Sequence, residues 1–303
     1  MLLADYSLTS LAESTAAAEG CDRSRRTVVA TRPCSDSHKR TNSVPLDLLS
    51  GSRTAAPQPR APAGRVIYAV GDVHGCADLL ANLLETILRD VAQLKVTQRP
   101  ILIFVGDYVD RGDKSPEVID MVLRLMAEGR FEVRALKGNH EQSLLDFLDD
   151  AGVGPSWAEY GGLQTLRSYG VQPPARKADV RAWEMTREQF LERFPSEHLA
   201  FLRGLELMVT YGDYAFVHAG VRDSVPLSSQ SEEDLLWIRG DFLRAKGPFE
   251  KVIVHGHTPD TEPFVGSARI GIDTGAYATG LLTAVRLMAS ERLILQARLA
   301  PPR

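Results

Sequence analysis

Three short motifs in the first half of the chain each begin with a glycine that is followed by residues of types that bind metals. The motifs are Gly71-Asp72-Val73-His74-Gly75, Gly106-Asp107-Tyr108-Val109-Asp110-Arg111-Gly112 and Gly138-Asn139-His140-Glu141. The first two follow apolar runs at 66–70 and 101–105, which have the length of buried strands. Strands and helices that alternate at this spacing predict a βαβαβ unit, whose parallel strands end at one edge of the sheet. The three motifs should therefore meet in space.

Apolar spacing and capping residues mark the other elements of this unit. Leucines and an isoleucine recur at helical spacing within 77–94, which predicts a helix that covers the sheet. A second helix is expected to start with Ser115 as its hydroxyl cap and to end at Gly129. A third strand is predicted at 132–136, and a short helix is predicted from Glu141.

The alternation of strand and helix stops between about residues 152 and 207, where helical patterns predict a helical insertion. Aromatic side chains in a small helical layer are usually core. Trp157, Tyr160 and Trp183 are therefore interpreted as core residues, with a substrate groove as the alternative. The β period then returns, and Tyr211-Gly212-Asp213-Tyr214 predicts a hairpin turn.

The C-terminal third of the chain contains short strands and little helix. The strands are expected at 252–257, 269–273, 281–287 and 293–297. This succession predicts a second sheet packed on the first. The sequence as a whole therefore predicts an α/β fold, in which a two-sheet β-sandwich is flanked by helices and carries a helical insertion.

Residues 1–64 differ from the rest of the chain in composition. They are rich in Ser, Thr, Arg, Ala and Pro and have no sustained hydrophobic period, so we expect a disordered tail and linker. The alternative is a docking or targeting tail, because arginines among serines resemble a transit segment. The catalytic domain is expected to cover residues 65–303.

Composition also narrows the compartment and the partners. Three cysteines without disulfide-type spacing suit a reducing compartment, so we expect a cytoplasmic protein. No apolar run is long enough to cross a bilayer, and no membrane partner is expected. Without the tail the chain has 27 basic and 33 acidic residues, and this excess of acid disfavours nucleic acid as a partner.

Five of the seven histidines fall at strand ends or in the loops after them, namely His74, His140, His218, His255 and His257. A single histidine of this kind is usually a packed residue, but this set accompanies the carboxylates and the amide of the three motifs. Carboxylate, amide and imidazole ligands together suit divalent Mn, Fe or Zn. A carboxylate able to bind two cations would make the site dinuclear.

Two further motifs lie in the second half of the chain, Val217-His218-Ala219-Gly220 and Gly256-His257-Thr258-Pro259. Together the five motifs resemble, in order, those of the PPP-type serine/threonine protein phosphatases within the calcineurin-like metallophosphoesterase superfamily. The resemblance spans about residues 65–287 and is closest to bacterial and phage members, which share the stretch Ile272–Ala276. It implies the metallophosphoesterase sandwich and two divalent ions, with Mn²⁺ expected first and Fe or Zn as alternatives.

The resemblance also implies a role for each matched position. The metal ligands would be Asp72 and His74 for the first ion, Asp107 as the bridge, and Asn139, His218 and His257 for the second ion. His255 lies two residues before a matched ligand. It is interpreted as a neighbour of the site, with a swapped assignment as the alternative.

Four further residues match catalytic positions of the family. Arg111 and Arg239 match arginines that clamp phosphate, since a guanidinium fork suits two phosphate oxygens at once. His140 would give a proton to the leaving group, with Asp110 orienting its ring. The resemblance implies direct attack by a hydroxide that bridges the two ions, without a covalent enzyme intermediate.

These roles predict a phosphoprotein phosphatase that acts on phosphoserine and phosphothreonine, with phosphotyrosine as a further substrate. The alternatives are a symmetrical diadenosine tetraphosphate hydrolase and a broad-specificity metallophosphoesterase. Asp110 favours the phosphatase, because a phosphate leaving group needs less help from an acid and members resembling the hydrolase tend to lack this aspartate. A catalytically dead binding module would have lost ligands, and all six matched ligands are present.

Overall fold

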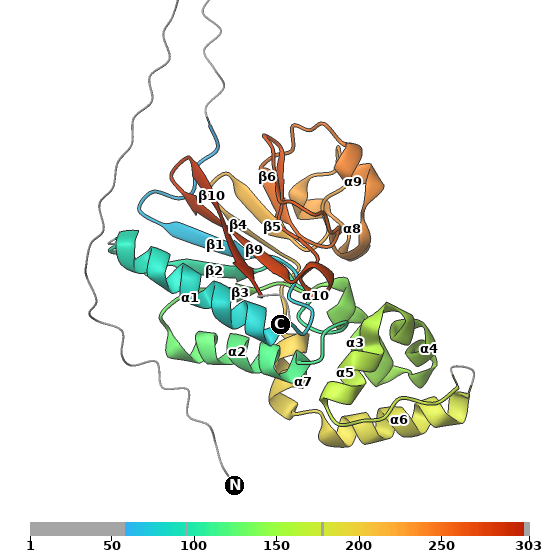
Figure 1. Cartoon of the computed structure of the whole chain (residues 1–303). Coiled ribbons are helices and arrows are strands. Elements are labelled where there is room, and N and C mark those ends of the chain that lie inside the picture. The colour runs from blue at the N-terminus through green and yellow to red at the C-terminus, as the bar shows by residue number, and fades with distance from the viewer. Residues whose placement is uncertain (1–57, 95, 177–178, 300–303) are drawn as a thin grey trace, which may run out of the picture. The chain divides into compact units, whose positions relative to one another are not determined.

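The computed structural model describes residues 58–94, 96–176 and 179–299. The predicted tail lies outside the described residues, except for 58–64. The described chain is an α/β fold of two five-stranded sheets with helices on their outer sides (Figure 1), which confirms the predicted fold class. None of the helices in these ranges is long and apolar enough to span a membrane.

The first sheet contains the predicted βαβαβ unit. Its strands, in the order β10-β9-β1-β2-β3, are β10 (Glu291–Arg298), β9 (Leu281–Met288), β1 (Val66–Val70), β2 (Ile101–Phe104) and β3 (Glu132–Ala135). β1, β2 and β3 are parallel, with Ile67 opposite Ile101 and Ile101 opposite Glu132. The crossover helices between them are α1 (Ala77–Leu94) and α2 (Ser115–Glu128).

The second sheet is mixed as well. Its strands, in the order β4-β5-β6-β8-β7, are β4 (Met208–Tyr211), β5 (Tyr214–Val217), β6 (Val252–His255), β8 (Arg269–Gly271) and β7 (Phe264–Val265). β5, β6 and β8 are parallel, and β4 joins β5 through the predicted hairpin turn. The ends of β5 and β6 therefore form a second sheet edge that can carry ligands.

The prediction that all C-terminal strands belong to the second sheet is wrong for β9 and β10. β9 pairs antiparallel with β1, and β10 pairs with β9. Leu282 and Ala284 of β9 lie in the core under the helices, whereas Val285 and Leu287 lie in the core between the sheets. A strand with two apolar faces needs cover on both sides, and this position in the first sheet provides it.

The described chain has three hydrophobic clusters, and the side chains of β1 alternate between two of them. Tyr68 and Val70 belong to the cluster that includes α1 and α2, whereas Ile67 belongs to the cluster between the two sheets. A third cluster joins the second sheet to α8 (Glu232–Trp237) and α9 (Gly240–Arg244). Burial of these apolar faces holds the two sheets together. It also fixes the positions of the strand ends that the polar motifs follow.

The bounds of α1 and α2 agree with the prediction, but the cap of α2 does not. The sequence predicts Ser115 as the cap, whereas Lys114 holds that position and caps with no side-chain hydrogen bond. Ser115 is the first helical residue, and its buried hydroxyl lies 3.3 Å from the hydroxyl of Thr165 in the insertion. The serine therefore joins α2 to the insertion. Gly129 ends the helix as predicted, in the left-handed conformation.

Helix α3 (Asn139–Asp149) starts two residues earlier than the predicted Glu141. Glu141 Oε2 accepts the backbone N–H of Gly138 at 2.9 Å, so the glutamate closes the first turn from inside the helix. Asn139 and His140 are therefore held on the first turn of a helix rather than on a loose loop.

From residue 151 to residue 203, the described chain contains only helices and loops. They are η1 (Ala151–Val153), α4 (Gly154–Trp157), η2 (Ala158–Gly162), α5 (Leu163–Ser168), α6 (Val180–Arg193) and α7 (Ser196–Arg203). Trp157 and Trp183 are core residues as predicted, each 1% exposed. The prediction is wrong for Tyr160, which is 64% exposed. Tyr160 lies in η2, a π-helical turn next to the predicted catalytic residues.

Candidate metal centre

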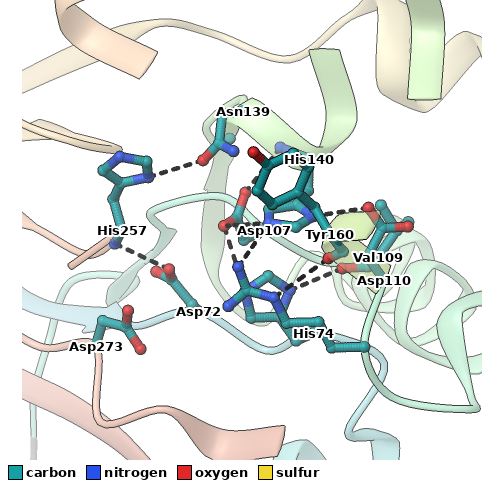
Figure 2. Close-up of polar contacts among 12 residues, drawn as sticks. Asp72, His74, Asp107, Val109, Asp110, Asn139, His140, Tyr160, His257 and Asp273 are labelled. Atoms are coloured by element: carbon teal, nitrogen blue, oxygen red, sulfur yellow. Dashed lines mark hydrogen bonds and ion pairs between the residues drawn. The ribbon is translucent and has the colours of Figure 1, made fainter. Parts of the chain in front are cut away.

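Side chains from both sheets meet at the C-terminal ends of the parallel strands (Figure 2). The six predicted ligands are Asp72 and His74 after β1, Asp107 after β2, Asn139 on the first turn of α3, His218 after β5 and His257 after β6. All six are buried. The fold therefore brings together residues that are far apart in the sequence, as the spacing of the motifs predicts.

Asp107 lies between two groups of potential metal ligands. One group contains Asp107, His74 and His140, and the other contains Asp107, His218 and His257. The Oδ2 atom of Asp107 is 3.4 Å from His74 Nε2, and its Oδ1 atom is 3.4 Å from His218 Nε2. Two oxygens directed at different histidines suit a carboxylate that bridges two cations.

The second group fits a cation because its lone pairs converge. His218 Nδ1 donates to the carbonyl of Val105 at 3.0 Å, which leaves Nε2 of that ring as an acceptor. This Nε2 lies 2.9 Å from Asn139 Oδ1 and 3.1 Å from His257 Nδ1, and the last two atoms are 2.7 Å apart. One proton cannot satisfy three acceptors at these distances, whereas a divalent cation can.

His74 and Asp72, the ligands predicted for the first ion, also present acceptor atoms that suit a cation. His74 Nδ1 donates to the carbonyl of Val109 at 2.9 Å, so Nε2 turns a lone pair toward the Asp107 carboxylate. Asp72 Oδ2 accepts the backbone N–H of His257 at 2.9 Å. Its Oδ1 is buried and has no hydrogen-bond partner among the described residues. A buried carboxylate oxygen without a partner also fits a cation.

The electrostatics of the buried groups support the same assignment. Burial lowers the pKa of His74 to about 3 and that of His257 to about 2, and it also lowers the pKa of His218. These rings are therefore neutral, which is the form that binds a metal. Burial raises the pKa of Asp72 well above its usual value, and the carboxylate of Asp273 raises it further. A cation beside Asp72 would favour its ionised form.

Asp273 is a residue of the site that sequence analysis did not single out. It lies beside Asp72 (Figure 2) and is buried, and its Oδ1 accepts the N–H of Gly275 at 2.9 Å. Burial raises the pKa of Asp273 to about 6. The signal was an acidic residue directly after the apolar end of a strand, within the stretch Ile272–Ala276.

The backbone is strained at the site. Seven residues other than glycine have a positive φ in the described chain. Five of them are His74 (+47°), Asp107 (+54°), Asp110 (+71°), Arg111 (+68°) and His257 (+65°). Residues other than glycine rarely adopt a positive φ, so the surrounding contacts must hold the backbone in this conformation.

Glu141 supplies much of that restraint in the loop after β2. Its Oε2 accepts the N–H of Asp107 at 2.8 Å, in addition to the N–H of Gly138. Its Oε1 accepts the N–H groups of Tyr108 at 2.8 Å and Val109 at 3.2 Å. The sequence places Glu141 in the third motif and predicts a helix start there, but it does not predict this restraint. Its position as an acid in the first turn after Gly138 was the available signal.

Two glycines allow the loops to approach one another. A Cβ atom on Gly138 would lie 2.0 Å from Asp107 Oδ1, and one on Gly256 would lie 1.9 Å from Asp72 Oδ1. Any side chain at either position would push a predicted ligand out of place.

His140 and Asp110 form a buried pair beside the first group. His140 Nδ1 donates to Asp110 Oδ2 at 2.7 Å. Asp110 also accepts from Trp157 Nε1 at 2.8 Å and from Thr165 Oγ1 at 2.6 Å, so the insertion fixes its orientation. Burial acts to lower the pKa of His140, but the carboxylates of Asp107 and Asp110 outweigh it and raise the pKa. The ring is therefore oriented and able to carry a proton.

The two arginines that are predicted to clamp phosphate lie beside different ligand groups. Arg111 Nη2 lies 3.0 Å from His140 Nε2, and its guanidinium stacks on the ring of Tyr277 at 4.6 Å. Arg239 Nη1 donates to the carbonyl of His257 at 3.0 Å. Each arginine therefore borders one of the two ligand groups that share Asp107.

His255 is buried but belongs to neither group of potential ligands. Its Nδ1 lies 3.0 Å from the carbonyl oxygen of Gly256, and its Nε2 lies 3.3 Å from Arg269 Nη1. The ring also packs against Phe242, in the core between the second sheet and its helices.

The family model described as Calcineurin-like phosphoesterase matches residues 65–282. The chain belongs to this family. Members of the calcineurin-like phosphoesterase family use divalent metal ions, and the His/Asp groups around Asp107 are able to hold them. The superfamily that the five motifs predict is thus confirmed.

Two relatives carry the same name. The bis(5'-nucleosyl)-tetraphosphatase PrpE [asymmetrical] of Anoxybacillus flavithermus is 29% identical over 237 residues, which covers 72% of this chain and 88% of the relative. The protein of that name from Bacillus velezensis is 26% identical over 246 residues, covering 75% of this chain and 91% of the relative. Neither relative is named a protein phosphatase.

Two solved structures share the fold. A "putative diadenosine tetraphosphatase" has a TM-score of 0.54 at 17% identity and covers 80% of this chain and 100% of its own. A cold-active protein tyrosine phosphatase has a TM-score of 0.50 at 17% identity and covers 78% of this chain and 81% of its own. At this identity the likeness concerns the fold alone.

Proposed function

We propose that this member of the family hydrolyses dinucleoside tetraphosphates asymmetrically, releasing a nucleoside triphosphate and a nucleoside monophosphate. The observation that carries the proposal is the name of the relatives, which match this chain over 88% and 91% of their own length. A relationship over nearly the whole catalytic domain favours a common class of substrate. This assignment replaces protein phosphatase as the first reading of the site.

The charges around the centre suit a polyphosphate chain. Arg111 borders the group that contains His74, and Arg239 borders the group that contains His257. A tetraphosphate presents several anionic groups in a row, so more than one of its phosphates could meet a guanidinium. A phosphate monoester would offer only one such group.

We propose that Asp72, His74 and Asp107 hold one divalent ion. Asp107, Asn139, His218 and His257 would hold the second, and Mn²⁺ is our prediction for both. When bound, the ions would polarise the phosphoryl oxygens and lower the pKa of a water molecule. The protein itself holds these side chains in place through the backbone hydrogen bonds described above.

The buried pair of His140 and Asp110 favours a second candidate substrate, a phosphoserine or phosphothreonine of a protein. The alkoxide released from such an ester is strongly basic and needs a proton, and His140 is oriented to give one from Nε2. A nucleotide phosphate leaves without such help. The pair therefore has a clear use in ester hydrolysis and a smaller one in tetraphosphate hydrolysis.

Arg111 limits when His140 can act. Arg111 Nη2 can donate to His140 Nε2 at 3.0 Å only when that nitrogen has no proton. A phosphate oxygen is a better acceptor for the guanidinium than a neutral imidazole. Substrate binding would therefore draw Arg111 away from Nε2 and leave His140 free to bind and donate a proton.

The test compares the two substrates on one preparation of Mn²⁺-loaded protein. Diadenosine tetraphosphate and a phosphoserine peptide are supplied separately, and the products are separated by chromatography. Asymmetrical hydrolysis gives ATP and AMP in equal amounts, symmetrical hydrolysis gives only ADP, and the peptide gives inorganic phosphate. We expect ATP and AMP, with kcat/KM higher than for the peptide. Release of ADP alone, or a faster reaction with the peptide, would refute the proposal.

A further inference from the structure

A cavity of about 380 Å³ lies beside the metal centre. It is lined by Cys76 and Leu79 near the start of α1, by Arg111, Asp113 and Lys114 in the loop before α2, and by Tyr277 of α10 (Ala276–Thr279), among others. A volume of this size is in the range of small-molecule sites. A larger cavity of about 550 Å³ lies at the other end of β1 and is lined by none of the proposed site residues.

The cavity and the metal centre share a wall. The ring of Tyr277 packs edge-on against His74, with ring centroids 5.3 Å apart. Arg111 also lines the cavity, and its guanidinium reaches His140 Nε2 at 3.0 Å. A ligand with a phosphate at the centre would therefore need only a short link to place its remainder in the cavity.

The lining does not suit a second anion. Lys114 forms an ion pair with Asp78 at 2.7 Å, so its charge is already balanced. Asp113 also lines the cavity and forms no hydrogen bond or ion pair within the part of the chain that the structure describes. A free carboxylate accepts hydrogen bonds from hydroxyl and amino groups and repels phosphate.

The aromatic wall suits a flat ring. Tyr277 is 42% exposed although it stands next to the buried centre. Leu299, which is 41% exposed, adds apolar surface to the same cavity. An aromatic face, apolar walls and one free carboxylate together match a nucleoside, which has a flat base, hydroxyl groups on the ribose and no charge of its own.

We propose that this cavity is the nucleoside subsite of the enzyme, in which the base contacts the Tyr277 ring and the ribose hydroxyls meet Asp113. The inference rests on the proposed function and adds where one end of the substrate binds. Because the cavity adjoins His74, it takes the nucleoside that is joined to the centre by a single phosphate. This is the end that asymmetrical hydrolysis releases as the monophosphate.

The experiment measures binding rather than turnover. Calorimetry on the full-length, Mn²⁺-loaded protein compares AMP, ribose 5-phosphate and inorganic phosphate. AMP should bind about tenfold more tightly than ribose 5-phosphate, the usual worth of stacking one base on an aromatic ring. Tyr277→Leu should reduce that ratio to within about twofold, and Tyr277→Phe should keep it.

Asp113→Ala gives an independent reading, because Asp113 lies on an exposed loop. It should weaken AMP and ribose 5-phosphate several-fold while leaving inorganic phosphate unchanged. The matched control is Phe264→Leu, which truncates an exposed aromatic side chain on β7 that does not line the cavity. This control should leave all three affinities unchanged.

The outcomes separate the subsite from the reaction. Equal binding of AMP and ribose 5-phosphate by the unaltered protein, or a ratio that Tyr277→Leu does not change, would overturn the subsite even if diadenosine tetraphosphate is hydrolysed. A base preference that depends on Tyr277, in a protein that does not hydrolyse diadenosine tetraphosphate, would uphold the subsite and reject the proposed function.

Discussion

Asp110 shows how one side chain of the site is fixed by its neighbours. It accepts hydrogen bonds from the side chains of His140, Trp157 and Thr165, and it is fully buried. The last two donors come from the insertion, so the insertion determines the orientation of the His140 ring. The assignment of His140 as a proton donor therefore depends on contacts that no motif contains.

Asp107→Asn and His140→Asn should separate metal binding from proton donation. Asp107→Asn removes the charge shared by both ligand groups, so it should lower the metal content and abolish turnover of every substrate. His140→Asn should keep about two ions per chain and slow phosphoserine hydrolysis by roughly 10²–10⁴-fold, the usual worth of a general acid. Elemental analysis and kcat measure the two effects.

An aryl phosphate is the control substrate for this pair of variants. Its phenolate leaving group is a weak base, so His140→Asn should slow it by a clearly smaller factor. Loss of metal from His140→Asn would instead make His140 a ligand, in line with its place in the group around His74 and Asp107.

Glu141→Gln should weaken the metal centre without touching a predicted ligand. Replacing one carboxylate oxygen by an amide nitrogen leaves at least one buried backbone N–H without its acceptor. We expect a loss of about 2–3 kcal/mol in the free energy of unfolding and weaker Mn²⁺ binding. Glu117→Gln, at an exposed position on α2, is the control in urea denaturation. Equal stability of the two variants would contradict the role of Glu141.

At the scale of elements, the edge strands of the two sheets are tied together by side chains. Glu132 opens β3, and it accepts hydrogen bonds from Tyr211 of β4 at 2.6 Å and from Arg65 at 2.5 Å. The hydrogen bond from Tyr211, followed by that from Arg65, lowers the pKa of Glu132 below its usual value of 4.5. The contact therefore depends on an ionised carboxylate.

The lowered pKa of Glu132 predicts a stability contribution that depends on pH. A depressed pKa stabilises the fold above the unfolded value of 4.5, and the contribution is lost as the pH falls through the folded value. Glu132→Gln should therefore unfold about 1 kcal/mol more easily than the unaltered protein at pH 7, and this difference should shrink as the pH falls below 4.5. Urea titrations at several pH values measure this, with Glu128→Gln as the exposed control. A difference that stays constant with pH would rule out the mechanism.

Elements formed by local pattern could be predicted, and elements placed by long-range pairing could not. The bounds of α1 and α2 follow from apolar spacing and from Gly129, which ends α2. The motifs locate the six predicted ligands in or next to the segments that follow strands. The placement of β9 beside β1 is different, because an apolar strand is equally compatible with either sheet until its partners are known. Asp273 and Tyr277 reach the site through that same C-terminal segment, and sequence reasoning gave neither a role.

At the scale of the whole molecule, residues 58–64, the end of the predicted tail and linker, contact the fold. Arg60 N donates to the side-chain Oδ2 of Asp213 in the β4–β5 turn, and Arg60 O accepts the N–H of Asp213. Ala61 N donates to Ala289 O in the β9–β10 turn. Deleting residues 1–57 should leave the melting temperature unchanged, because their composition predicts no core. Deleting residues 1–64 should lower it by about 5 °C. Calorimetry decides, and equal melting of both truncations would show that these contacts are dispensable.

Chelation should affect both activity and stability of the whole protein. Removal of divalent ions should abolish turnover, and Mn²⁺ should restore it better than Fe²⁺ or Zn²⁺. Ions that bind only the folded state also stabilise it, so the chelated protein should melt at a lower temperature. Full activity in a metal-free preparation would exclude the dinuclear centre.

The ligands of the proposed centre come from both sheets. The side chains after β1 and β2 belong to one sheet, and those after β5 and β6 belong to the other, with Asp107 reaching toward both groups. Any sliding of one sheet across the other would thus change the separation of the two ions. The magnetic coupling between paired Mn²⁺ ions, which depends on their separation, would then report the relative position of the two sheets. A cavity made between the sheets, for example by Ile270→Ala, should shift that coupling in an electron paramagnetic resonance spectrum even though no ligand has been altered.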